Sequence, residues 1–182
     1  MSDYTRSNVL TSFPLTINDI VFRLAREDDL PKLEWFGEYT HFRSIFDYTF
    51  QEQKKQRRLM LLADFNGFPI GQIFILFKES GFLFGGENER GYLYSLRVME
   101  PFQHLGIGTA LLQRAESLML ERRLSYATIA VAKDNDRALR LYERSGFTIY
   151  AEDDGRWSYI DHEGNLIDVH EPCWLMEKIL SI

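Results

Sequence analysis

Two glycines between a predicted strand and a predicted helix carry the clearest chemical signal in this sequence. Residues 93–98 are short, apolar and end in a β-branched valine, so they predict a strand that Pro101 terminates. From Ile107 onward apolar residues recur at helical spacing, which places Gly106 and Gly108 at a helix N-terminus. The first amides of a helix lack partners and carry partial positive charge. This junction therefore predicts a site for phosphate.

Two of the phosphate-binding motifs that begin this way do not fit. A P-loop requires lysine after its glycine, but Gly106 is followed by Ile107, Gly108 and Thr109. A dinucleotide-binding fingerprint requires a third glycine, and Leu111 stands in its place. A glycine turn that serves only helix packing remains an alternative at this point.

A second strand and helix follow. Residues 126–132 predict a buried strand, and Asn135 is well suited to begin a helix that Gly146 ends. Tyr142 lies seven residues after Asn135, so the two lie on nearly the same side of that helix, two turns apart. From spacing alone, Tyr142 can be a core aromatic residue or a catalytic one.

Together these segments resemble the GCN5-related N-acetyltransferase (GNAT) superfamily. The acetyl-CoA motif of that superfamily, Gln/Arg-x-x-Gly-x-Gly/Ala, is similar to Gln103, Gly106 and Gly108, preceded by Leu96 and Val98 on the strand. A later motif, Asn-x-x-Ala-x-x-Leu-Tyr-x-x-x-Gly-Phe, is matched by Asn135, Ala138, Leu141, Tyr142, Gly146 and Phe147. The resemblance extends from Ile20 to Ile149 and is clearest from Leu93 onward.

The resemblance implies an α/β fold with a mixed, mostly antiparallel central sheet flanked by helices. We expect one N-acetyltransferase domain over residues 1–182, since a chain of 182 residues with 45% hydrophobic residues can bury a single core. Residues 156–170 predict an added hairpin between the last two main strands. It can cover the acceptor pocket, or it can only extend the sheet or cover an edge.

The resemblance also implies roles for single residues, with acetyl-CoA as co-substrate. The residues expected to contact the cofactor are Leu96, Arg97, Val98, Gln103, His104, Leu105, Gly106, Ile107, Gly108, Thr109, Asn135 and Tyr142. Amides from His104 to Thr109 hold the pyrophosphate, and the backbone of residues 96–98 pairs with the pantetheine arm. The Val98 amide is the candidate donor to the developing oxyanion. Tyr142 is the candidate general acid for the leaving thiolate.

The general base is not identified by the resemblance. Ribosomal-protein alanine acetyltransferases, which this chain resembles, have glutamate five residues before the motif asparagine, where this sequence has Ala130. This departure counts against that mechanism and that substrate. Other members have glutamate on the strand before the pyrophosphate loop, but Tyr92, Tyr94 and Ser95 occupy that stretch. Glu87 and Glu89 fit solvated turn residues, and a water relay through Tyr94 or Ser95 remains open.

Charge favours an amine acceptor of unidentified structure. Residues 151–182 contain eight Asp/Glu and two Lys/Arg, whereas residues 1–150 contain nineteen of each, so the whole net charge of −6 lies in the tail. We hypothesise that this field attracts a cationic acceptor, either a small molecule or a peptide. The alternative is a solvated acidic face that maintains solubility.

Several classes of function are disfavoured. The chain lacks a basic stripe for nucleic acid, an apolar run for a membrane span and a secretory signal, so we expect a cytoplasmic protein. His162, Glu163, His170 and Glu171 do not repeat at zinc-like spacing, and we expect no metal. Cys173, the only cysteine, has no recognisable base beside it. A non-catalytic acyl-CoA-binding or sensor domain is the alternative function, and a homodimer stays an open expectation.

The first half of the chain predicts the remaining elements. These are a strand at residues 21–24, a helix from Arg26 that contains Leu33 and Phe36, a helix that includes residues 50–58, and a hairpin of residues 59–65 and 70–77 with Asn66-Gly67 at its turn. Lys54, Lys55, Arg57 and Arg58 fit a solvated helix face, or less simply a contact to the CoA 3′-phosphate. Trp35, Phe36, Phe42, Phe46, Tyr48 and Phe50 can line a pocket or pack in the core. Residues 80–91 are a glycine-rich connection.

Overall fold

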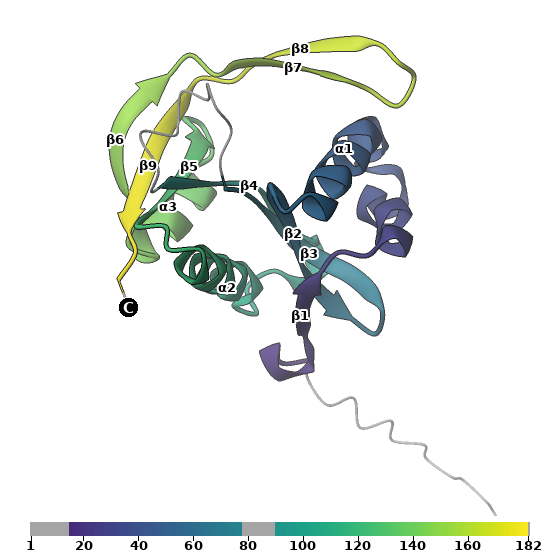
Figure 1. Cartoon of the computed structure of the whole chain (residues 1–182), viewed down its shortest axis with the longest axis horizontal. Coiled ribbons are helices and arrows are strands. Elements are labelled where there is room, and N and C mark those ends of the chain that lie inside the picture. Colours follow the sequence, from purple (N-terminus) through teal and green to yellow (C-terminus); the bar gives the residue numbers. More distant parts are fainter. Residues whose placement is uncertain (1–14, 78–89, 182) are drawn as a thin grey trace, which may run out of the picture.

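The computed structural model describes residues 15–77 and 90–181. Seven strands form one mixed sheet in the order β1-β2-β3-β4-β5-β9-β6, and only the pair β4 and β5 is parallel (Figure 1). The seven strands are β1 Val21–Leu24, β2 Arg58–Phe65, β3 Phe68–Leu76, β4 Arg90–Val98, β5 Tyr126–Ala132, β6 Thr148–Asp153 and β9 Cys173–Ile179. A separate two-stranded sheet consists of β7 Arg156–Ile160 and β8 Leu166–His170.

Helices cover both faces of the large sheet (Figure 1). The helix α1 Arg43–Lys54 and the 3₁₀ helices η2 Glu27–Gly37 and η3 Thr40–Phe42 lie on one face. The helices α2 Ile107–Glu121 and α3 Asp136–Arg144 lie on the other. Two short 3₁₀ helices, η1 Ile17–Asp19 and η4 Glu100–Phe102, precede β1 and α2. This α/β architecture confirms the fold class predicted from the sequence.

Alternation along the central strands separates two apolar cores. In β2, Leu59 and Leu61 belong to the core beneath α2, whereas Met60 and Leu62 belong to the core beneath α1. All four side chains are buried. Because side chains on a strand point alternately to opposite faces, an almost continuous apolar run is the expected pattern for a strand covered on both sides. Each such burial contributes about 1.5–3 kcal/mol before the entropy cost of ordering is counted.

The parallel pair β4 and β5 is joined only along its first half. Its pairing runs from Arg90 opposite Tyr126 to Leu93 opposite Ile129 and then ends. Just beyond that point β4 has an irregularity in its register with β3, and Ser95 there has a φ of 53°. A bulge of this kind bends a strand and increases its twist. The second half of β4 therefore separates from β5 and opens the middle of the sheet.

Several predicted elements are confirmed at or near their bounds. The strand at residues 21–24 is β1, the strand at residues 126–132 is β5, and the helix from Ile107 is α2. Strands β2 and β3 form the expected hairpin. At its turn Asn66 has a φ of 52° and Gly67 a φ of 80°, as a two-residue hairpin turn with two positive φ angles requires. The hairpin expected over residues 156–170 is formed by β7 and β8.

The helix predicted to include residues 50–58 is present over residues 50–54, and the prediction is wrong for residues 55–58. The observed helix α1 begins at Arg43 and ends at Lys54, and Arg58 is already the first residue of β2. The chain leaves the helix through Gln56, whose φ is 60°. Phe46 and Phe50, four residues apart and both buried, form the apolar face that fixes this helix against the sheet.

The helix predicted from Arg26 is a 3₁₀ segment with a break. In η2, Trp35 and Phe36 have φ values of 42° and 60°, which turn the chain before Gly37. Leu33 and Trp35 are buried as core residues, but the side chain of Phe36 is 89% exposed and stacks on Phe68. Phe36 therefore neither packs in the core nor lines the cavity described below.

The predicted solvated face of four basic residues is correct only in part. Lys54 pairs with Glu27, while Lys55 and Arg57 pair with Glu52. Arg58 instead lies in β2 and donates from Nη1 to the hydroxyl of Tyr94 at 2.9 Å.

Most of the glycine-rich connection predicted at residues 80–91 lies outside the described residues, including Glu87 and Glu89. Gly91 is already within β4. None of the described helices combines the length and the apolar character needed to cross a bilayer.

Candidate active site

The turn from β4 into α2 presents backbone donors to solvent. Within the described part of the chain, none of the amide groups from His104 to Thr109 donates a hydrogen bond, and the first amide satisfied in α2 is that of Ala110. His104 has a φ of 65° and Gly106 a φ of 81°, both in the left-handed region. Left-handed residues between right-handed ones turn successive amides into one concave group that suits an anion. The turn therefore has the backbone geometry that an anion site requires, and the anion itself stays a prediction.

Gly106 and Gly108 serve different purposes in that turn. A side chain on Gly106 would meet no atom within 4 Å, so the positive φ is what requires glycine there. A Cβ on Gly108 would lie 3.4 Å from the Leu141 side chain of α3. This is an ordinary contact distance, so α2 and α3 pack against each other at Gly108, and the two motifs that stood out in the sequence lie side by side.

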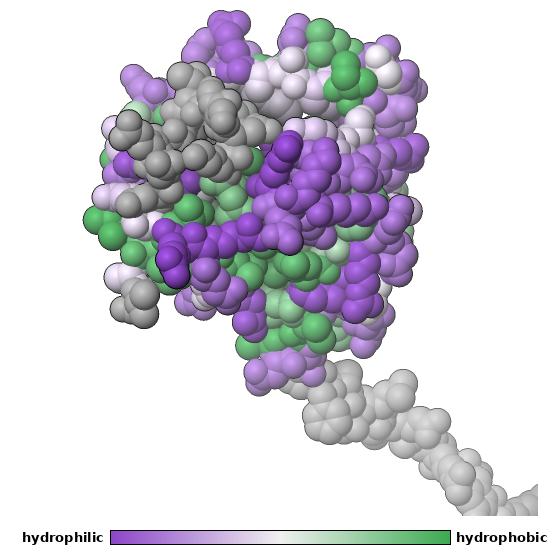
Figure 2. Space-filling model, viewed as in Figure 1, coloured by the Kyte–Doolittle hydropathy of each residue, from purple (hydrophilic) through white to green (hydrophobic). Residues whose placement is uncertain are grey.

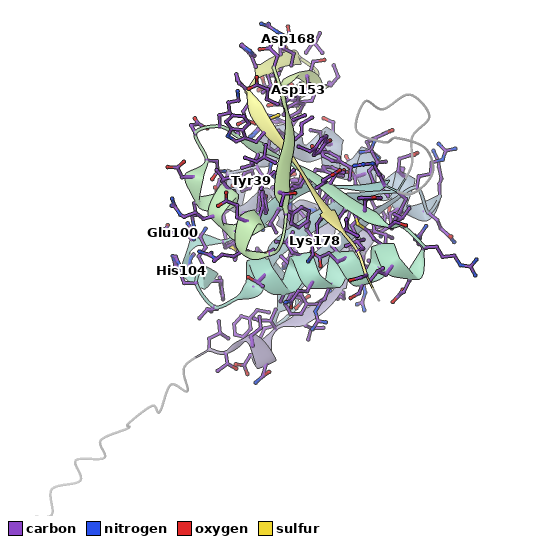
Figure 3. All side chains as sticks on the ribbon, turned by 90° about the vertical axis from the view of Figure 1, so that its left-hand side faces the viewer. Tyr39, Glu100, His104, Asp153, Asp168 and Lys178 are labelled. Atoms are coloured by element: carbon purple, nitrogen blue, oxygen red, sulfur yellow. The ribbon has the colours of Figure 1, made fainter. Side chains whose placement is uncertain are left out.

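His104 marks the exposed side of the same turn. Its Nε2 lies 3.4 Å from Nη2 of Arg137, in the first turn of α3 (Figure 3 shows His104 and Glu100 beside the start of α2). Asn135, one of the predicted cofactor contacts, caps α3 by accepting from the Ala138 amide at 3.0 Å. The sequence analysis overlooked Arg137, although it lies inside the second motif, two residues after Asn135.

Val98 directs its backbone toward the opening between β4 and β5. The next residue, Met99, donates from its amide to the Ile70 carbonyl of β3 at 2.8 Å. Consecutive residues of a strand point their backbone groups to opposite edges, so the Val98 amide faces away from β3. In agreement with this, the Val98 carbonyl accepts from Gln103 Nε2 at 2.8 Å. Gln103 thereby links the end of β4 to the turn before α2.

A cavity of about 900 Å³ lies between α1, the carboxyl ends of β4 and β5, and the hairpin of β7 and β8. Its aromatic walls include Phe42, Tyr48, Tyr92, Tyr94, Trp157 and Tyr159. Of the aromatic residues that the sequence analysis considered for a pocket, Phe42, Phe46 and Tyr48 line this cavity, whereas Trp35 and Phe50 are buried in the core.

Tyr142 reaches this cavity from α3. Its side chain is 6% exposed, yet its hydroxyl group forms no hydrogen bond with any of residues 15–77 and 90–181. Burial raises the pKa of Tyr142, so the phenol stays protonated at neutral and mildly alkaline pH. The geometry places a proton donor at the edge of the cavity, and Tyr142 also packs against Phe147 at a ring-centroid distance of 6.2 Å.

The tyrosines of β4 are poor proton acceptors. Burial raises the pKa of Tyr92 and of Tyr94. The Tyr94 hydroxyl also accepts a hydrogen bond from Arg58, as described above. Ala130 lines the cavity at the position where the related alanine acetyltransferases have glutamate. A base must therefore be found elsewhere in the lining.

Five charged side chains line the cavity. Three are basic, namely Arg58, Arg97 and Arg156, and two are acidic, namely Asp153 and Glu171. Asp153 is the last residue of β6, and Glu171 lies in the connection between β8 and β9. Figure 3 shows Asp153 well apart from His104. The sequence analysis named Glu171 only in a rejected metal cluster. Glu171 lies at the cavity because of how the outer strands pair, and patterns in a single sequence do not reveal that pairing.

Most of the acidic tail is occupied by local contacts. Glu152 pairs with Lys133, and Asp154 pairs with both Arg156 and His170. Asp161 accepts from the amides of its own turn, those of Glu163 and Asn165. Of the described acidic residues of the tail, Asp153 and Glu171 line the cavity, so most of the acidic excess is spread over the hairpin and the outer strands.

The cysteine of the cavity is not activated. Cys173 is buried, and its burial together with the carboxylates of Asp153 and Glu171 raises the pKa of its thiol. A thiol is nucleophilic only as the thiolate, which these surroundings disfavour. Among residues 15–77 and 90–181, no group of three or more His, Cys, Asp or Glu is arranged to hold a metal ion.

Solved structures with the same architecture are acetyltransferases. Ribosomal-protein-alanine N-acetyltransferase from Brucella melitensis is 18% identical, with a TM-score of 0.66 over 88% of this chain and 99% of that one. A spermidine N-acetyltransferase chimera of SpeG from Vibrio cholerae and hSSAT is 14% identical, with a TM-score of 0.67 over 89% and 96%. A chain of the NatC complex bound to Gag peptide and CoA is 16% identical, with a TM-score of 0.64 over 90% and 99%.

The sequence itself also matches a family model. The model describes the acetyltransferase (GNAT) family and matches residues 23–147, more than half of the chain. The match includes β4, the glycine turn, α2, β5 and α3, the elements that carry the exposed amides and Tyr142. The sequence motifs, the architecture and this match agree that the chain belongs to the acetyltransferase (GNAT) family and is an acyltransferase.

Proposed function

We propose that this acyltransferase moves an acetyl group from acetyl-CoA to a primary amine by direct attack of that amine. The observation that carries the proposal is the row of unpartnered amides from His104 to Thr109, which leads along β4 toward the cavity containing Tyr142. These donors fit a pyrophosphate, and the open edge of β4 fits an amide-containing arm. Acetyl-CoA, when bound there, supplies the acetyl group as a thioester whose C–S bond breaks as a C–N bond forms.

The chain provides two groups for the transfer itself. The Val98 amide, which faces the open edge of β4, donates a hydrogen bond to the acyl oxygen and stabilises the negative charge that develops on it. Tyr142 donates its hydroxyl proton to the departing sulfur. Burial raises the pKa of Tyr142, so the proton is present on the phenol at neutral pH. Direct attack is favoured because the Cys173 thiol is held protonated and is a poor carrier of the acetyl group.

The proton released by the amine requires an acceptor. Among the residues that line the cavity, Asp153 and Glu171 are the two carboxylates. Asp153 already accepts from the Gly155 amide at 2.7 Å, whereas none of the described residues donates a hydrogen bond to the Glu171 carboxylate. We assign proton uptake to Glu171, directly or through one water molecule, with Asp153 stabilising the incoming ammonium.

A combined binding and turnover measurement tests this proposal. Calorimetry with CoA is expected to show one site per chain, and thiol release with acetyl-CoA is expected to rise when primary amines are added. Turnover with Glu171→Gln is expected to fall by about 100-fold. Binding of CoA with no thiol release on any amine would instead indicate a non-catalytic acyl-CoA-binding or sensor domain. Absence of CoA binding would overturn the proposal altogether.

A further inference from the structure

Arg97 stands out because it is a partly buried cation that forms no ion pair with any described residue. It lies on β4, lines the cavity, and is covered by two aromatic rings from the segment before α1. The centre of its guanidinium lies 4.3 Å from the ring centroid of Tyr39 and 4.7 Å from that of Phe42. Its Nη1 is buried and has no hydrogen-bond partner in the described part of the chain.

A comparison with Arg23 shows that the lack of an ion pair at Arg97 is unusual. Arg23 is also poorly exposed, and its guanidinium is held by two carboxylates, with Asp29 Oδ2 at 2.6 Å and Asp64 Oδ2 at 2.5 Å. Arg97 forms no ion pair within the described residues, and burial lowers its pKa. Arginine nevertheless keeps its charge in proteins. An unpaired buried charge is costly, so a position that retains one requires a reason.

The surroundings of Arg97 define what it can bind. The rings of Tyr39 and Phe42 are nearly parallel, with an interplanar angle of 9°, and the guanidinium lies over them. Its N–H donors lie in its own plane, so the partner must approach edge-on. A planar carboxylate matches this fork with two parallel hydrogen bonds. The nearby Glu38 carboxylate attracts Arg97 without forming an ion pair with it. No described carboxylate occupies the fork itself, so the fork is open to the carboxylate of a ligand.

The opposite charge lies elsewhere in the same cavity. Asp153 and Glu171 line the cavity near Cys173, which pairs with Asp153 between β9 and β6. Cys173 also pairs with Ala132 at the end of β5, and Tyr142 lines the same cavity. The carboxylates are therefore at the end of the cavity formed by β5, β9 and β6, whereas Arg97 is on β4 beside Tyr39 and Phe42.

The distribution of charge in this cavity suits a molecule with both signs of charge. We propose that the acceptor is an amine that also bears a carboxylate, with Arg97 binding the carboxylate while the amine lies between Tyr142 and the acidic pair. The aromatic walls between these two ends favour an apolar body for such an acceptor. The inference rests on the proposed acetyl transfer to an amine, and it replaces a purely cationic acceptor with an amino acid or a similar zwitterion.

Calorimetry with CoA-loaded protein tests the inference independently of turnover. The probes are two pairs of amines with and without a carboxylate: L-phenylalanine against 2-phenylethylamine, and 6-aminohexanoate against hexylamine. In at least one pair the carboxylate-bearing member is expected to bind tighter by on the order of 10- to 100-fold, because a hydrogen-bonded charge pair is formed. Arg97→Gln is expected to reduce that preference to about 3-fold or less, and Arg97→Lys to reduce it in part.

Arg114→Gln is the matched control variant. Arg114 also lies over an aromatic ring, that of Phe22 at 4.2 Å, but it is on α2 and does not line the cavity. It is expected to keep the full preference for the carboxylate. Equal affinity of both members in the wild-type protein, failure of both acids to bind, tighter binding of spermidine, or a preference that survives in Arg97→Gln would each overturn the inference.

Thiol release in the same samples separates this inference from the proposed function. Acetyl transfer to both members of each pair at similar rates, with similar affinities, would support the function and refute the role of Arg97. Carboxylate-dependent binding that is lost in Arg97→Gln, but without acetyl transfer, would support the binding role and refute the proposed function.

Discussion

At the scale of single residues, the site depends on groups whose ordinary partners are missing. Among the described residues, the buried phenol of Tyr142 forms no hydrogen bond, and the buried Nη1 of Arg97 has no acceptor. Tyr142 could be predicted from the sequence because a motif marks its position. The side chain of Arg97 could not, because its aromatic neighbours Tyr39 and Phe42 lie more than fifty residues earlier in the chain. Sequence reasoning assigned Arg97 only a backbone role.

Replacement of Tyr142 by phenylalanine tests the role of its hydroxyl group. Tyr142→Phe is expected to lower kcat by about 100-fold, since a positioned general acid contributes at least that much. The affinity for CoA, measured by calorimetry, is expected to change by less than about 3-fold because the ring still packs against Phe147. Tyr126→Phe is the control, since Tyr126 lies on β5 outside the cavity lining. A fully active Tyr142→Phe would remove Tyr142 from the mechanism.

The pH dependence of kcat tests the same group. The folded pKa of Tyr142 is raised above that of a free tyrosine, which is about 10. A raised pKa means that the proton is retained as pH increases, so the acid is present throughout the neutral and mildly alkaline range. We therefore expect kcat at saturating acceptor to show no decline between pH 7 and about pH 10. A descending limb centred below pH 9 would indicate a different acid.

At the scale of elements, regular patterns were predictable and irregular ones were not. The apolar run of residues 126–132 gave the bounds of β5, and the glycine turn gave the start of α2. The left-handed pair in η2 was not foreseen, because bulky residues such as Trp35 and Phe36 rarely adopt a positive φ. Tertiary contacts hold them there, including the hydrogen bond from Trp35 Nε1 to the Pro69 carbonyl at 2.9 Å. A four-residue spacing of Phe46 and Phe50 was available as a signal for α1.

The turn before α2 can be tested with a pair of glycine variants. Gly106→Ala is expected to destabilise the fold by about 1–2 kcal/mol, because alanine is strained at a φ of 81°. It is also expected to weaken CoA binding by on the order of tenfold, since the amides around it are displaced. Gly164→Ala is the matched control: its φ is 89°, a Cβ there also meets no atom, and it lies in the hairpin turn.

Thermal unfolding and calorimetry distinguish the two effects. Both variants are expected to lose similar stability, and only Gly106→Ala to lose affinity for CoA. Equal CoA affinity in the two variants would mean that this turn does not bind the cofactor.

At the scale of the whole molecule, the hairpin of β7 and β8 connects the far end of the sheet with α1. Figure 1 shows it crossing over the molecule from β6 and β9, and Figure 2 shows apolar side chains on it above a hydrophilic face of α1. Ile160 and Leu166 at its outer end are 47% and 63% exposed. Tyr159 packs on Phe42 at a centroid distance of 5.1 Å. Its existence was predictable from two short apolar strands around a glycine turn, but its contact with α1 was not.

The contact between the hairpin and α1 can be tested by replacing one residue, Ser44. Ser44 donates from Oγ to the Ile160 carbonyl at 2.6 Å and lies 3.1 Å from that of Asp161. Ser44→Ala is expected to weaken this attachment by about 1 kcal/mol and to raise the KM for the acceptor several-fold. CoA affinity is expected to stay unchanged, because the cofactor turn lies on the opposite face of the sheet.

Ser117→Ala is the control, since the Ser117 hydroxyl bonds only within α2, to the Gln113 carbonyl at 3.0 Å. Hydrogen exchange of the hairpin amides is the second measurement and is expected to accelerate only in Ser44→Ala. Unaltered exchange and KM in Ser44→Ala would show that the hairpin is held by its aromatic contacts alone.

The short pairing between β4 and β5 has a consequence for cooperativity. One half of the large sheet, β1 to β4, is joined to the other half, β5, β9 and β6, through only four paired positions. A ligand arm that inserts between the diverging ends would act as a surrogate strand and complete the ladder. Ligand binding would then stabilise both halves of the sheet together. Saturation with ligand would therefore delay the unfolding of segments that do not contact the ligand.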